Sequence, residues 1–109
     1  MDEKRYRSQV NDALARIEKA FEAADPDVAE CEASAGALTI TLLDRFKIIV
    51  SPQPSQAQIW LAVSSEGKAY RFNFDAESKL WVNEHGSGAD LFGQISQAVT
   101  SVTKMQFSI

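Results

Sequence analysis

Residues 58–63 read Gln-Ile-Trp-Leu-Ala-Val (QIWLAV), and this stretch decides which face of the fold is buried. Ile59, Leu61 and Val63 alternate with the other three residues, and successive side chains of a β-strand point to opposite faces. The three aliphatic side chains are therefore predicted to line the core. Trp60, the largest side chain of the stretch, then points to the opposite face. An outward-facing tryptophan requires a reason, which depends on how the other segments of the chain fold.

Two amphipathic helices are predicted, one at each end of the chain. The first spans residues 3–24, ends because Pro26 disfavours a helical conformation at Asp25, and has an apolar stripe of Tyr6, Val10, Leu14, Ile17 and Phe21. The second begins after Gly88, where Ser87 and Asp90 form a loose capping signal. Its apolar stripe consists of Leu91, Ile95, Ala98 and Val102.

Six short segments between the helices are rich in β-branched and aromatic residues and are predicted to be strands. They lie near residues 28–34, 36–43, 45–50, 58–64, 68–74 and 80–83. The breaks between them are Ser34-Ala35-Gly36, Asp44, SPQPS at 51–55, SSEGK at 64–68 and DAESK at 75–79. Such short links favour an antiparallel meander, since parallel strands need long crossover connections.

The order helix, strands, helix predicts an α+β fold formed by a single domain over residues 1–109. The simplest arrangement is a two-layer α/β sandwich, with both helices packed on one face of an antiparallel sheet of about five or six strands. The other sheet face is then exposed to solvent, and Trp60 can lie on it.

Composition and charge narrow the function. The first ten residues lack the apolar stretch of a signal peptide and no apolar run reaches membrane-spanning length, so a cytoplasmic protein, or a mature form already processed, is expected. The net charge is −4, and residues 18–32 contain six acids and one base, whereas the remainder contains nine acids and ten bases. This distribution argues against nucleic acid or an anionic membrane as a partner. A cation or a basic protein surface fits better.

The six acids of residues 18–32 are the candidate metal ligands. Glu18, Glu22 and Asp25 fall in one band beside the apolar stripe of the first helix, and Glu30 and Glu32 share a face of the next strand, with Asp27 in the loop between. A solvated charged edge is the alternative interpretation. Exposed carboxylates would hold Fe2+, Fe3+, Mn2+ or Ca2+ weakly and with little selectivity. Cys31 and His85 are single, so oxygen ligands must dominate.

The chain resembles the frataxin family, of the bacterial type. The resemblance covers nearly the whole chain: an acidic first helix, then GALTITL at 36–42, KIIVSPQPSQAQIWLA at 47–62, YRFNF at 70–74, LWVNEHGSG at 80–88 and a closing helix. The stretch from Gln53 to Leu61, together with its spacing to Trp81, is the most specific part. Ser51 departs from the pattern, because many members carry an asparagine there.

The resemblance implies an iron-binding regulator or adaptor of iron–sulfur cluster assembly. Its partners would be the cysteine desulfurase and the scaffold protein, and it would be a monomer without metal. The acidic ridge would bind Fe2+ or Fe3+ weakly, and it matches Glu18, Glu22, Asp25, Asp27, Glu30 and Glu32. The expected partner contacts are Glu18 and Glu22 on the ridge and an outer-face patch made of Gln53, Gln58, Trp60 and Arg71.

Three other functions stay open from the sequence. The first is a ferroxidase, which would make the protein an enzyme, although no ExxH or multi-histidine set of a di-iron site is present. The second is an iron donor, or iron chaperone. The third is a protein-binding module whose metal affinity is incidental.

Overall fold

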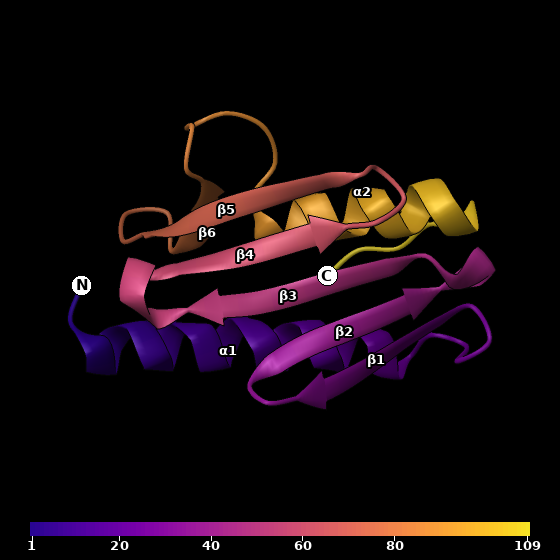
Figure 1. The fold of residues 1–109 in the computed structure, drawn as a ribbon, viewed down its shortest axis with the longest axis horizontal. Coiled ribbons are helices and arrows are strands. Elements are labelled where there is room, and N and C mark those ends of the chain that lie inside the picture. The colour runs from indigo at the N-terminus through magenta and orange to yellow at the C-terminus, as the bar shows by residue number, and fades with distance from the viewer.

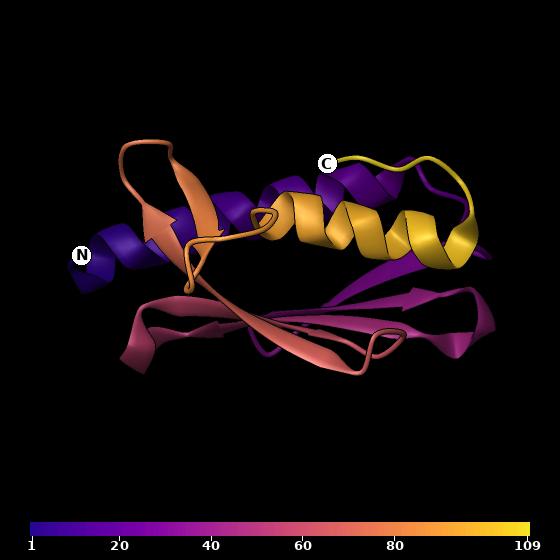
Figure 2. The same cartoon turned by 90° about the horizontal axis from the view of Figure 1, so that it is seen from above.

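A computed structural model describes the backbone of residues 1–109 and every side chain except that of Asp44. Two helices lie on one face of a six-stranded sheet, so the molecule has two layers (Figures 1 and 2). The helices are α1 (Glu3–Glu22) and α2 (Leu91–Thr103). The strands are β1 (Ala29–Ser34), β2 (Ala37–Leu42), β3 (Lys47–Gln53), β4 (Gln58–Val63), β5 (Lys68–Asp75) and β6 (Leu80–Asn83). The predicted α+β sandwich is therefore confirmed.

The buried face of α1 matches the predicted apolar stripe except at one position, where Ala13 is buried in place of Leu14. The buried residues of the helix are Tyr6, Val10, Ala13, Ile17 and Phe21, whereas Leu14 is only partly buried. The side chain of Asp2 caps the N-terminus by accepting a hydrogen bond of 2.7 Å from the N–H of Arg5. The helix ends at Glu22, two residues before the predicted end. Neither α1 nor α2 is long and apolar enough to cross a membrane.

The predicted capping role of Ser87 in α2 is wrong. Asp90 directly precedes the helix, and its side chain accepts a hydrogen bond of 3.2 Å from the N–H of Gly93. Gly88 has a φ of 81°, so the chain turns between Ser87 and the helix. The buried residues of α2 are Leu91, Ile95, Ala98, Val99 and Thr103, whereas Val102 of the predicted stripe is only partly buried.

The sheet is a meander in which every strand pairs antiparallel with its neighbour, in the order β1-β2-β3-β4-β5-β6. The predicted break at residues 51–55 begins too early, because β3 continues through Pro52 to Gln53. The β2 pairing stops at Val50, so residues 51–53 pair with β4 alone. A proline is tolerated there because one side of the strand has no partner. Gln53 therefore lies in the sheet opposite Gln58, not in the predicted loop.

The core lies between the helices and the inner face of the sheet. Ile59, Leu61 and Val63 are at most 1% exposed, which confirms the alternation in residues 58–63. Trp81 is also buried, and its ring meets that of Tyr6 edge to face at a centroid distance of 6.0 Å. The Tyr6 hydroxyl donates a hydrogen bond of 2.7 Å to the carbonyl oxygen of Gln58, which fastens α1 to the start of β4.

The link between β1 and β2 contains an unfavourable residue. Ala35 and Gly36 have φ values of 52° and 82°, the left-handed conformation that a two-residue hairpin requires. Asparagine adopts this conformation more readily than alanine. We expect Ala35→Asn to raise the free energy of unfolding by about 0.5–1 kcal/mol, measured by urea denaturation. Ala15→Asn at an exposed position of α1 should instead lower it by about 0.5 kcal/mol. A loss of stability at position 35 would contradict this prediction.

Candidate functional site

The acidic ridge is formed by the C-terminal half of α1, the turn after it and the edge strand β1. Glu18, Glu22 and Glu30 line one open hollow of about 290 Å³, together with the half-buried Cys31. The hollow brings together acids that are up to twelve positions apart in the chain, because α1 packs against β1. Half of the predicted ridge residues therefore share one depression in the surface.

The other three ridge residues are arranged differently. The Asp25 side chain accepts a hydrogen bond of 2.9 Å from the N–H of Asp27, so it stabilises the turn. Asp27 and Glu32 are exposed, and Glu32 lies farther along β1. Among the described residues, no group of three or more His, Cys, Asp or Glu side chains converges closely enough to hold a metal ion. The ridge is thus a row of separate carboxylates.

The negative charge of the ridge affects the pKa of the neighbouring Cys31 thiol. The Cys31 side chain is partly buried and packs against the core. Burial, and then the negative charges of Glu18 and Glu32, raise the pKa of the Cys31 thiol to about 11. The protonated thiol is therefore favoured at neutral pH, and the negative charges of two ridge carboxylates contribute to this shift.

The outer-face patch lies on three neighbouring strands. Trp60 pairs with Ser51 of β3 on one side and with Arg71 of β5 on the other, and Gln58 pairs with Gln53. The Arg71 guanidinium stacks 4.5 Å from the centre of the Trp60 ring, a cation–π contact. Ile49, Ala62 and Ala69 border an apolar hollow of about 280 Å³ beside them. The four patch residues thus form one continuous surface.

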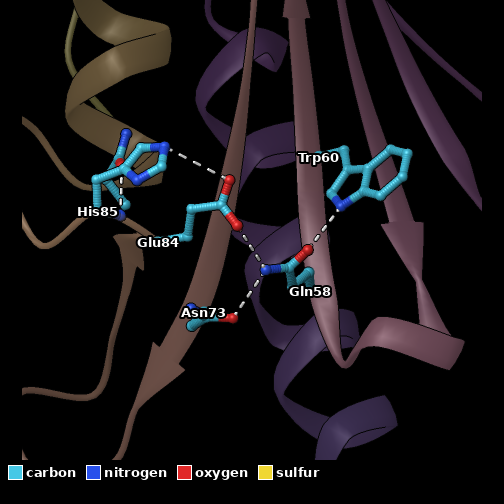
Figure 3. Close-up of polar contacts among 6 residues, drawn as sticks. Gln58, Trp60, Asn73, Glu84 and His85 are labelled. Atoms are coloured by element: carbon cyan, nitrogen blue, oxygen red, sulfur yellow. Dashed lines mark hydrogen bonds and ion pairs between the residues drawn. The ribbon is translucent and has the colours of Figure 1, made fainter.

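Gln58 holds the patch together (Figure 3). Its Oε1 accepts a hydrogen bond of 2.9 Å from the indole Nε1 of Trp60. Its Nε2 donates to Asn73 Oδ1 at 3.1 Å and to Glu84 Oε1 at 3.3 Å. The other carboxylate oxygen of Glu84 lies 3.7 Å from His85 Nε2. The side-chain amide of Gln58 therefore has a partner at both ends.

Sequence reasoning missed Asn73, Glu84 and Tyr6 as contacts of Gln58. The alternation of strand side chains could have predicted Asn73, because it lies two positions after Arg71 and so shares its face of the sheet. Glu84 follows β6 in an irregular turn, where no periodicity indicates its direction. The ridge and the patch also turn out to be separate: β2 and β3 lie between β1 and β4.

Comparison with known proteins identifies the family. Residues 1–105 match the family model of the frataxin-like domain. The iron-sulfur cluster assembly protein CyaY of Paraburkholderia phytofirmans is 36% identical over 100 residues, which are 92% of this chain and 90% of that protein. The protein of the same name from Stutzerimonas stutzeri is 31% identical over 107 residues, 97% of this chain and 89% of that protein. The chain belongs to the frataxin family, as its sequence motifs predict.

Two solved structures share the fold. Frataxin from Psychromonas ingrahamii superimposes with a TM-score of 0.86 at 18% identity, covering 99% of this chain and 97% of that one. Yeast frataxin gives a TM-score of 0.71 at 23% identity, covering 93% of this chain and 82% of that one. At these identities the likeness supports the fold alone.

Alkylation of Cys31, the single cysteine, tests the field of the ridge. The iodoacetamide rate should rise with pH toward a midpoint of about 11, above the ordinary value of 9.0, because burial and nearby carboxylates disfavour the thiolate. Glu18→Gln should lower this midpoint, although not to 9.0, since burial is the larger cause. Glu3→Gln at the far end of α1 is the matched control and should leave it unchanged. A wild-type midpoint near 9.0 in the folded protein would contradict the assignment.

Proposed function

We propose that this protein is an adaptor and regulator of iron–sulfur cluster assembly, which docks on the cysteine desulfurase and the scaffold protein and binds Fe2+ or Fe3+ weakly on its acidic ridge. Membership in the frataxin family supports the pathway, and so do its relatives, which are named as iron–sulfur cluster assembly proteins. The observation that carries the proposal is the pair of separate surfaces: a row of carboxylates at one edge, and an aromatic–guanidinium patch near the middle of the sheet.

The ridge suits a loosely held cation. Glu18, Glu22 and Glu30 supply hard oxygen ligands around an open hollow, which fits iron and also Mn2+ or Ca2+. The described acids do not converge into a preorganised set, so water must complete the coordination of any ion. Low affinity and low selectivity follow. Iron in this arrangement is an exchangeable ligand of the surface.

The outer-face patch suits a protein partner. Its tryptophan and arginine belong to the residue types that dominate binding energy at interfaces. Within the described part of the chain, no hydrogen bond or ion pair to another side chain uses the N–H groups of Arg71, which stacks on Trp60 instead. These N–H groups are available to a carboxylate or a backbone carbonyl of the partner.

The ridge carboxylates serve two ligands in this proposal. A cation and a basic patch of the desulfurase would compete for Glu18 and Glu22, so iron occupancy would change how the ridge meets the enzyme. This competition would link the iron level to the rate of sulfur supply. A ferroxidase finds less support, because catalysed oxidation benefits from ligands that converge on one position, and the described acids lie apart.

An anaerobic Fe2+ titration followed through the amide signals in NMR spectra tests the metal part. Paramagnetic broadening should be confined to residues 18–32 and should be lost when Glu18, Glu22 and Glu30 are all changed to glutamine. The variant Glu3→Gln with Asp12→Gln, which alters exposed acids elsewhere on α1, is the control. If no signal in residues 18–32 broadens at millimolar iron, iron binding must be removed from the proposal.

Charge reversal tests docking through the ridge. Glu18→Lys with Glu22→Lys should weaken binding to the cysteine desulfurase by about tenfold or more at low salt, and should flatten the dependence of the affinity on salt, because attraction becomes repulsion. The control Glu3→Lys with Asp12→Lys makes the same change in net charge on the same helix. Calorimetry at two salt concentrations provides the measurement, and equal affinities for both variants would rule out a role for the ridge in docking.

A further inference from the structure

We infer that Asn73 and Glu84 are positioning residues, which fix the orientation of Trp60 on the outer-face patch through the side chain of Gln58. The inference deepens the proposed function and rests on it for its biological consequence. Gln58 Nε2 donates to Asn73 Oδ1 at 3.1 Å and to Glu84 Oε1 at 3.3 Å, while its Oε1 accepts from Trp60 Nε1 at 2.9 Å (Figure 3). Neither acceptor touches Trp60 directly in this network.

The hydrogen-bonding groups on either side of the Gln58 side-chain amide, the Trp60 indole and the Glu84 carboxylate, determine the orientation of that amide. An indole N–H can only donate, so it requires the oxygen of Gln58. An ionised carboxylate can only accept, so Glu84 requires the nitrogen of Gln58. Both requirements are satisfied by the same orientation, and a flipped amide would violate both. Glu84 and Asn73 therefore hold the amide with its oxygen toward the indole.

The main chain keeps these groups in register. Gln58 and Asn73 are direct cross-strand partners in β4 and β5. The N–H of Glu84 donates to the carbonyl oxygen of Arg71 at 2.9 Å, which continues the pairing of β5 beyond the end of β6. The same Arg71 stacks over the Trp60 ring at 4.5 Å. Glu84 is thus tied through its backbone to Arg71, and its side chain is linked to Trp60 only by way of Gln58. Arg71 and Trp60 are the two residues that the patch would present to a partner.

A consequence for recognition follows. A free indole on a sheet surface can rotate about its side-chain torsions, and a partner must then offset the cost of ordering it. The network orders the ring before binding and keeps its face under the Arg71 guanidinium. Losing Asn73 and Glu84 should therefore weaken docking, although neither residue needs to contact the partner.

The indole N–H signals in NMR spectra test the inference directly, because the chain contains two tryptophans. In the variant Asn73→Ala with Glu84→Ala, the Trp60 indole proton should shift upfield, and its exchange with water should become about fivefold faster, as expected for the loss of one ordinary hydrogen bond. The Trp81 indole, buried on the other side of the sheet, should not change. Restoring one acceptor, in Asn73→Ala with Glu84→Gln, should return much of the Trp60 signal toward its original position.

Two further variants separate positioning from general disturbance of the fold. Gln58→Leu should reproduce the effect on Trp60, and adding Asn73→Ala and Glu84→Ala to it should change nothing more, since both act through Gln58. Asn11→Ala with Glu77→Ala changes the same residue types at exposed positions and should have no effect. An unchanged Trp60 signal in Asn73→Ala with Glu84→Ala would overturn the inference.

Affinity for the cysteine desulfurase distinguishes this inference from the proposed function. If the Trp60 indole responds and the affinity falls, with a larger fall in Trp60→Ala, both are supported. If the indole responds but Trp60→Ala binds as the wild type does, docking through the patch fails while the positioning role stands. If the affinity falls without any response of the indole, Asn73 and Glu84 are partner contacts and the positioning role is wrong.

Discussion

The coverage of one sheet face by both helices is the constraint on which the rest of the structure depends. Six strands present two faces, and α1 and α2 bury only the inner one (Figure 2). The alternation in β4 then places Ile59 and Leu61 inside and Trp60 outside. The Tyr6 hydroxyl, bonded to the Gln58 carbonyl, fastens the helix layer to this strand. The outward tryptophan is thus a consequence of the layer arrangement, and its exposure is stabilised by Gln58 and Arg71.

The two candidate surfaces differ in rigidity because they occupy different places in the sheet. β4 is hydrogen-bonded on both sides, so Gln58 and Trp60 have fixed backbone positions, and a side-chain network orders the Trp60 ring. β1 is an edge strand, and the ridge acids point into water from it and from the end of α1. The patch on β4 therefore suits recognition of a partner through a fixed arrangement of side chains. A long-range, salt-sensitive attraction for cations or basic groups suits the ridge.

Local patterns predict the fold well, and the misses in the sheet have a common physical origin. The stripes of both helices and the alternation in residues 58–63 depend on neighbours in the chain, so they are readable without a structure. Pro52 indicates a break in the sequence pattern, but β3 tolerates it because β2 stops pairing at Val50, and the end of that pairing cannot be read from the sequence. The contacts of Gln58 with Asn73 and Glu84 span 15 and 26 positions, and no periodicity connects residues at such separations. Ser87 failed as a cap for a simpler reason, since Asp90 stands closer to the helix.

The charges of the two surfaces constrain how one partner could use both. The ridge is negative, whereas Arg71 is the charged residue among the four that form the patch, with the Glu84 carboxylate beside it. Three strand spacings separate β1 from β4, or about 14 Å. Under the proposed function, a partner that touches both must present basic groups to the ridge and carboxylates or carbonyls to the patch at that separation. A partner turned by 180° would place like charges together at both ends, which costs several kcal/mol. The opposite signs therefore define one orientation of docking, and a cation on the ridge would weaken that preference at one end only.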